Sequence, residues 1–91
     1  MRNVSVRRDA VVRSIELVRA VEANYRDVGR LLENEKNSAG QNWNDDKFRQ
    51  YAQIVDSCSG ALNQPLADLK NCEQTLRRLL ASIDAYQSTR L

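Results

Sequence analysis

Residues 48–86 read FRQYAQIVDSCSGALNQPLADLKNCEQTLRRLLASIDAY, and this stretch decides the fold. One apolar column recurs in it every seven residues and comprises Phe48, Val55, Leu62, Leu69, Leu76 and Ile83. Three residues after each member, a companion column reads Tyr51, Cys58, Pro65, Cys72, Leu79 and Tyr86. Two adjacent columns at this spacing are typical of a long helix that packs along its length. The pattern predicts a helix over about residues 45–88.

The first half of the chain carries the same period. Val4, Val11, Val18, Tyr25 and Leu32 recur every seven residues, with Ile15, Val21 and Val28 beside them, which predicts a helix over about residues 5–37. Residues 36–46 between the helices contain turn formers, with Gly40 suited to ending the first helix and Asn44 or Asp45 to capping the second. Because the connection is short, the helices should be antiparallel neighbours. We therefore expect an all-α fold, an antiparallel helical hairpin that forms a single domain over residues 1–91.

Pro65 is the one residue that conflicts with a continuous second helix. Inside a helix, proline removes a backbone hydrogen bond and its ring clashes with the carbonyl four residues earlier, here that of Ala61. One possibility is a kink near Pro65 that preserves the helix. The other is a break that gives three helices, at roughly 5–37, 45–60 and 65–88. The apolar column keeps its register from Leu62 to Leu69, which favours the kink.

A single hairpin would leave much of both apolar faces uncovered, and a core this thin is marginal for a chain of 91 residues. We therefore expect the hairpin to pair with itself, or with a similar small helical protein, into a four-helix bundle. The predicted helix–helix interface comprises Val11, Val18, Val21, Tyr25, Val28, Leu32, Phe48, Tyr51, Val55, Cys58, Leu62, Leu69, Cys72, Leu76, Leu79 and Ile83.

The composition argues against catalysis. Histidine is absent, so the commonest general base and zinc ligand are missing, and the three glycines form no phosphate loop. Glu33, Glu35, Asp45 and Asp46 near the turn have the pattern of solvated or capping residues. We predict no catalytic, cofactor-binding or metal-binding residue. Nucleic acid is not an expected partner either, because the arginines of the first helix alternate with acids one turn away and the net charge is only +2.

The sequence contains no apolar run longer than three residues, so it predicts neither a signal-peptide core nor a membrane span. We expect a cytoplasmic protein, or one secreted without a cleaved signal peptide. Cys58 and Cys72 would lie about 21 Å apart along one helix, too far to form a disulfide. Their place in the companion column predicts that both are buried in the core as small apolar side chains.

Trp43 stands at the predicted turn, directly before the second helix, and Phe48 and Tyr51 follow it. A short chain of two helices with a tryptophan at the turn resembles the WXG-type (Esx-like) family of type VII secretion. The likeness covers nearly the whole chain in length and helix layout, while its specific part is Trp43 with the Phe48 and Tyr51 spacing. It implies a non-enzymatic protein that acts through helix–helix contacts as a secretion substrate, chaperone or adaptor. The implied partners are a secretion apparatus or an effector protein.

Two positions depart from the family pattern. Asp45 stands where the family has the glycine of Trp-x-Gly, and Arg90 stands where an acidic residue would follow Tyr86 in the export signal. The alternative function is therefore a cytoplasmic coiled-coil adaptor with no link to secretion. For Trp43 itself we expect a ring folded against the end of the hairpin, a role compatible with recognition of a partner at that end.

Overall fold

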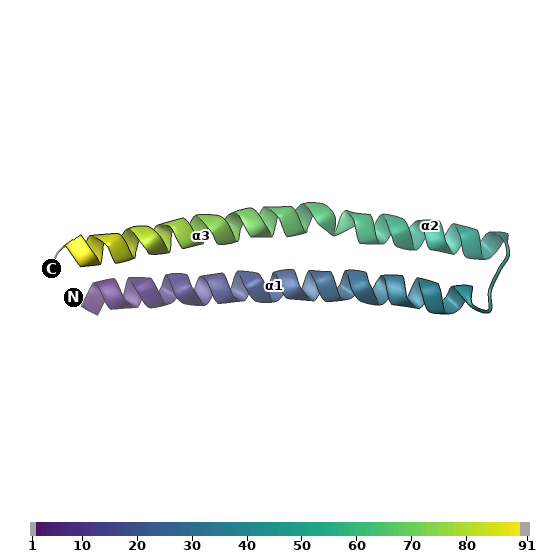
Figure 1. The fold of residues 1–91 in the computed structure, drawn as a ribbon, viewed down its shortest axis with the longest axis horizontal. Coiled ribbons are helices and arrows are strands. Elements are labelled where there is room, and N and C mark those ends of the chain that lie inside the picture. The colour runs from purple at the N-terminus through teal and green to yellow at the C-terminus, as the bar shows by residue number, and fades with distance from the viewer. Residues whose placement is uncertain (1, 90–91) are drawn as a thin grey trace. The chain divides into compact units, whose positions relative to one another are not determined.

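The computed structural model describes the backbone of residues 2–89 and the side chains of residues 6–86. All regular structure in this range is helical and falls in α1 (Arg2–Gly40), α2 (Asp46–Ala61) and α3 (Asn63–Thr89) (Figure 1). The all-α prediction is confirmed. The first helix begins and ends slightly outside the predicted bounds of 5–37. No described helix combines the length and the apolar character that crossing a membrane requires.

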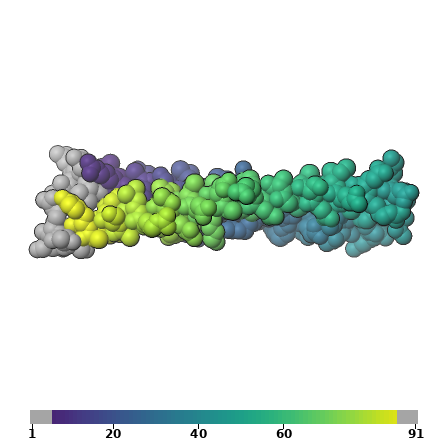
Figure 2. Space-filling model, turned by 90° about the horizontal axis from the view of Figure 1, so that it is seen from above, coloured from purple at the N-terminus to yellow at the C-terminus, as the bar shows by residue number. Residues whose placement is uncertain are grey.

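The chain comprises two compact units. The terminal unit contains Met1–Glu22 and Asp68–Leu91, so it pairs the first part of α1 with most of α3. The turn unit contains Ala23–Ala67, which is the rest of α1, all of α2 and the start of α3. In Figure 2 the side chains of paired helices lie directly against one another, and no other described segment covers the face shown. Each unit is therefore a single layer of two helices.

In the turn unit, contacts between the helices show that they are antiparallel. Lys36 Nζ lies 2.8 Å from Asp56 Oδ1. Nearer the turn, a Cβ atom added at Gly40 would lie 3.0 Å from Phe48 Cζ. Farther from the turn, one added at Gly29 would lie 3.5 Å from Leu62 Cδ1. As the residue number falls along α1, the residue number of its partner rises along α2. The two helices are therefore antiparallel, as the hairpin prediction requires.

The terminal unit is antiparallel as well. Arg8 Nε donates to Asp84 Oδ1 at 2.8 Å, and Arg8 Nη2 lies 3.5 Å from Asp84 Oδ2. This hydrogen bond and the negative charge of Asp84 raise the pKa of Arg8. Farther along α1, the side chain of Glu22 interacts with that of Glu73 on α3. The pairing again runs backward along one helix and forward along the other.

The main apolar columns lie between the paired helices, whereas most of the companion column of α2 and α3 is exposed. Among the predicted interface residues, those that are buried or half-buried are Val11, Val18, Tyr25, Leu32, Phe48, Tyr51, Val55, Leu62, Leu69, Leu76 and Ile83. Those that are exposed are Val21, Val28, Cys58, Cys72 and Leu79. The prediction that both cysteines are buried in the core is therefore wrong for the single chain.

The surface along which two paired helices contact each other, here called the seam, contains two columns from each helix. The second column lies four residues after the main column, whereas the predicted companion column lies three residues after it. In α1 this inner column comprises Arg8, Ile15, Glu22, Gly29 and Lys36, and in α2 and α3 it comprises Ala52, Ser59, Leu66, Glu73 and Leu80, all buried or half-buried. Small members such as Gly29, Ala52 and Ser59 let the paired helices approach closely, whereas Tyr51 would hold them apart. Among the described side chains, the only buried apolar ones are Ile15 and Val55, each 6% exposed.

The second helix bends at Leu62. This residue joins α2 to α3 and stays in the right-handed helical region, with φ −79° and ψ −15°. Its N–H donates to the Ser59 carbonyl at 3.2 Å, which tightens the turn, and Leu66 N–H donates back to the Leu62 carbonyl at 3.1 Å. Pro65 is the third residue of α3, where a backbone N–H is not needed. The predicted kink is therefore present, a few residues before the proline.

Replacing Pro65 by alanine should change the free energy of unfolding by less than about 1 kcal/mol. Pro65 lies in the first turn of α3, where no intrahelical N–H is required, so the usual penalty of about 3 kcal/mol for an interior proline should not apply. Urea unfolding of the wild type and of Pro65→Ala measures the difference. A gain in stability of 2 to 3 kcal/mol, on the order of that penalty, would show that the clash persists.

Glu73 makes the stability of the terminal unit dependent on pH. The hydrogen bond that Arg77 Nε donates to Glu73 at 2.8 Å lowers the pKa of Glu73 from its ordinary value of 4.5. A lowered carboxyl pKa adds stability above the ordinary value, and this stability is lost as the pH falls through the lowered one. Between pH 7 and pH 3 the wild type should therefore lose more stability than Glu73→Gln.

Urea unfolding at both pH values measures this loss, and Glu16→Gln is the matched control because Glu16 is an exposed acid of the same unit. The control should lose as much stability as the wild type does. Equal losses in the wild type and in Glu73→Gln would contradict a stabilising role for the ionised carboxylate.

Candidate functional site

Three aromatic side chains gather at the connection between α1 and α2. Trp43 stacks on Tyr51 with ring centroids 5.4 Å apart and an interplanar angle of 27°. It also meets Phe48 edge-on at 5.6 Å and 70°. Phe48 and Tyr51 lie one turn apart on α2, with centroids 6.0 Å apart. We call these residues the aromatic turn cluster. Such pairs favour edge-on and offset contacts of this kind, which hold the loop against the first turn of α2.

Asp45 fixes both the start of α2 and the orientation of the tryptophan. It is the N-cap residue, with extended backbone angles, and its Oδ1 atom accepts from the Phe48 N–H at 3.0 Å. The same oxygen accepts from Trp43 Nε1–H at 2.8 Å. Of the two predicted caps, the structure therefore uses Asp45. A glycine at this position would leave both donors without this acceptor, so the departure from Trp-x-Gly has a structural role of its own.

Gly40 is the last residue of α1, as predicted, but the role of the glycine differs from the predicted one. It does not adopt a left-handed conformation, as a glycine that terminates a helix often does. Instead it makes room for Phe48, whose ring would lie 3.0 Å from an added Cβ atom. The small residue thus allows the aromatic turn cluster to sit close to the end of α1.

Trp43 is packed on one side and open to solvent on the other. Its side chain is 37% exposed, while its only polar atom already bonds to Asp45. What the ring offers outward is therefore apolar surface. The expected fold of the ring against the hairpin end and a role in partner recognition are both compatible with this geometry.

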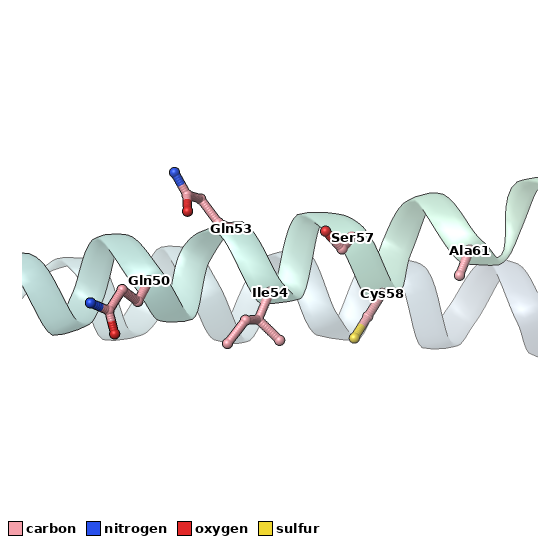
Figure 3. Close-up of a pocket in the computed structure, with 6 residues that line it drawn as sticks. All are labelled: Gln50, Gln53, Ile54, Ser57, Cys58 and Ala61. Atoms are coloured by element: carbon pink, nitrogen blue, oxygen red, sulfur yellow. The ribbon is translucent and has the colours of Figure 1, made fainter.

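The outer face of α2 carries a shallow groove (Figure 3). Its lining residues are Gln50, Gln53, Ile54, Ser57, Cys58 and Ala61. In Figure 3 Ile54 and Cys58 point to the same side of the helix, and Gln53 points to the other. Ile54 is 62% exposed. Cys58, predicted to be buried in the core, therefore lies in an open groove with an apolar neighbour.

Three of the four acids near the turn have structural partners, and the fourth, Glu35, is exposed. Glu33 lies 3.1 Å from Lys36 Nζ, Asp46 pairs with Arg49, and Asp45 caps α2. Hydrogen bonds with Asp56 and Glu33 raise the pKa of Lys36. Over the residues that the structure describes, no three or more acidic or cysteine side chains are grouped to hold a metal ion. The arrangement supplies helix caps and ion pairs.

Sequence reasoning missed the exposed apolar side chains Leu17, Leu31 and Ile54. They are 68%, 59% and 62% exposed, respectively. Each lies three or four residues from an exposed residue of the predicted interface: Leu17 from Val21, Leu31 from Val28, and Ile54 from Cys58. That spacing is a signal for a second apolar face on the same helix, and it was readable from the sequence.

Replacing Asp45 by glycine, which restores the Trp-x-Gly pattern, should destabilise the protein by about 0.5–1.5 kcal/mol. The change removes a cap acceptor, and it also removes the acceptor of the indole N–H. Thermal unfolding followed by circular dichroism measures the loss. Asp45→Asn is the control, because its amide oxygen can still accept both hydrogen bonds and should keep most of the stability. If the two variants unfold alike, the shared acceptor is not what stabilises the turn.

Comparison of the chain with family models, with curated proteins and with solved structures finds no match. The likeness to WXG-type proteins therefore rests on features of this chain alone. These are the helix layout, the tryptophan at the turn, and the two aromatic residues that follow it on α2.

Proposed function

We propose that this chain is a non-enzymatic helical module that binds other proteins through helix–helix contacts. The observation that carries the proposal is the thin core. Ile15 and Val55 are the only buried apolar side chains in the described range, while larger ones such as Leu17 and Ile54 stand mostly in solvent. Exposed apolar residues at helical spacing favour a helical partner that covers them. The expected partner is a second copy or a similar small helical protein.

Within this class, we favour a divergent WXG/Esx-like protein associated with type VII secretion, as substrate, chaperone or adaptor. Support comes from the aromatic turn cluster, in which Trp43 presents an apolar ring beside the first turn of α2. The secretion apparatus or an effector would be the further partner, and the chain would leave the cell without a cleaved signal peptide. The alternative is a cytoplasmic coiled-coil adaptor, which the loss of the Trp-x-Gly glycine favours.

Export tests the choice between the two. In the bacterium that encodes the chain, we expect the protein in the culture medium, and its retention in cells when the gene for an FtsK/SpoIIIE-like ATPase is deleted. Trp43→Ala should reduce export while circular dichroism still shows helix. If the protein stays in the cytosol, and the small amount released by lysis is the same with and without the ATPase, secretion is contradicted and the adaptor is favoured. A gene for such an ATPase, or for a large toxin, next to this one would support secretion.

A further inference from the structure

Helix α1 carries a second apolar face, on the side that its paired helix leaves uncovered. Successive members lie three or four residues apart, which places them on one face of the helix. We call this set the outer stripe, and it comprises Ala10, Ser14, Leu17, Val21, Asn24, Val28 and Leu31. None of its members is charged, although charged residues are frequent in the same helix.

The outer stripe is open to solvent. Leu17 and Leu31 are 68% and 59% exposed, and Val21 and Val28 are 41% and 39% exposed. The Ser14 hydroxyl already donates to the Ala10 carbonyl at 2.8 Å, so it can be covered without losing a hydrogen bond. The stripe is therefore chemically suited to burial against another apolar helix face.

The two ends of the stripe carry opposite charges. The next positions in the same spacing are Arg7 before Ala10 and Glu35 after Leu31, and both are exposed. Neither forms an ion pair with another residue in the described part of the chain. Val21 lies halfway between them in sequence. A helix of this kind is complementary to an antiparallel copy of itself, whereas a parallel copy would place like charges together.

We infer that the outer stripe is the docking surface for a second copy of this chain, with the two α1 helices antiparallel. Arg7 of each copy then lies near Glu35 of the other, and the apolar members between them cover one another. The inference rests on the proposed function in that it names the surface and one partner of the helix–helix contacts. Because the contact is twofold, each copy contributes the same residues and the charge pair forms twice.

A charge swap tests the orientation. By sedimentation equilibrium at micromolar concentration, the wild type should have near twice the 10.4 kDa chain mass. Arg7→Glu and Glu35→Arg should each raise the dimer Kd about tenfold, because two ion pairs become like-charge contacts. The double variant Arg7→Glu/Glu35→Arg should return to within about threefold of the wild type. Arg30→Glu is the matched control, because Arg30 is exposed, lies three or four residues from no member of the stripe and changes the net charge equally; it should leave the Kd unchanged.

Thiol cross-linking tests the register in a Cys58→Ser/Cys72→Ser background. With a short bis-maleimide, Val21→Cys should cross-link to itself. Ala10→Cys should cross-link to Leu31→Cys when the two are mixed, and neither should do so alone. Self-linkage at Ala10→Cys would indicate a parallel pair and overturn the inference. Circular dichroism confirms that each variant is helical.

Two results would overturn the docking surface and leave the proposed function standing. One is a wild type that stays monomeric at all concentrations. The other is a dimer whose Kd is unchanged by Leu31→Lys, with Ala23→Lys as the exposed off-stripe control. The proposed secretion role has a separate test, because absence of ATPase-dependent export would contradict it whether or not the chain pairs with itself.

Discussion

The structure depends on one packing constraint: a layer of two helices can bury only a narrow seam on each. Either of the two columns beside the main apolar column could complete that seam. The chain uses the column that contains Gly29, Ala52 and Ser59, because small side chains let the backbones approach. Larger apolar residues such as Leu79 are then left outside. The thin core, the charged seam and the exposed apolar faces all follow from this choice.

Charged residues in the seam have a clear structural consequence. Arg8 with Asp84, and Lys36 with Asp56, link the paired helices within their own units. Exposed pairs of this type add little to stability, but they oppose a shift of one helix along the other. Glu22, only 3% exposed, lies in the same inner column and interacts with Glu73 of the paired helix. A buried carboxyl group is costly unless its partner is in place, so it favours one register over its neighbours.

The seven-residue period predicted the helices, the short connection predicted their antiparallel order, and Pro65 predicted a kink in the second helix. It could not decide which flanking column turns inward, because columns three and four residues after the main one share the same period. The buried placement of Cys58 and Cys72 failed for that reason. At the turn, cap chemistry identified Asp45 as a candidate. The Asp45 Oδ1 atom also accepts a hydrogen bond from the indole N–H of Trp43. This bond depends on the path of the loop, which could not be predicted from the local sequence.

The same constraint bears on the proposed binding of partners, because little unpaired polar chemistry remains on these surfaces. The indole N–H is already bonded, the hydroxyl of Ser14 is satisfied within α1, and several charges are paired within their units. What faces outward at the turn and along α1 is apolar surface, which gives affinity with little directional preference. Direction must then come from the few exposed charges at the ends of that surface. Arg7 and Glu35 supply opposite signs at opposite ends of one helix face, so in the inferred pairing they would fix an orientation and register that the apolar residues alone do not specify.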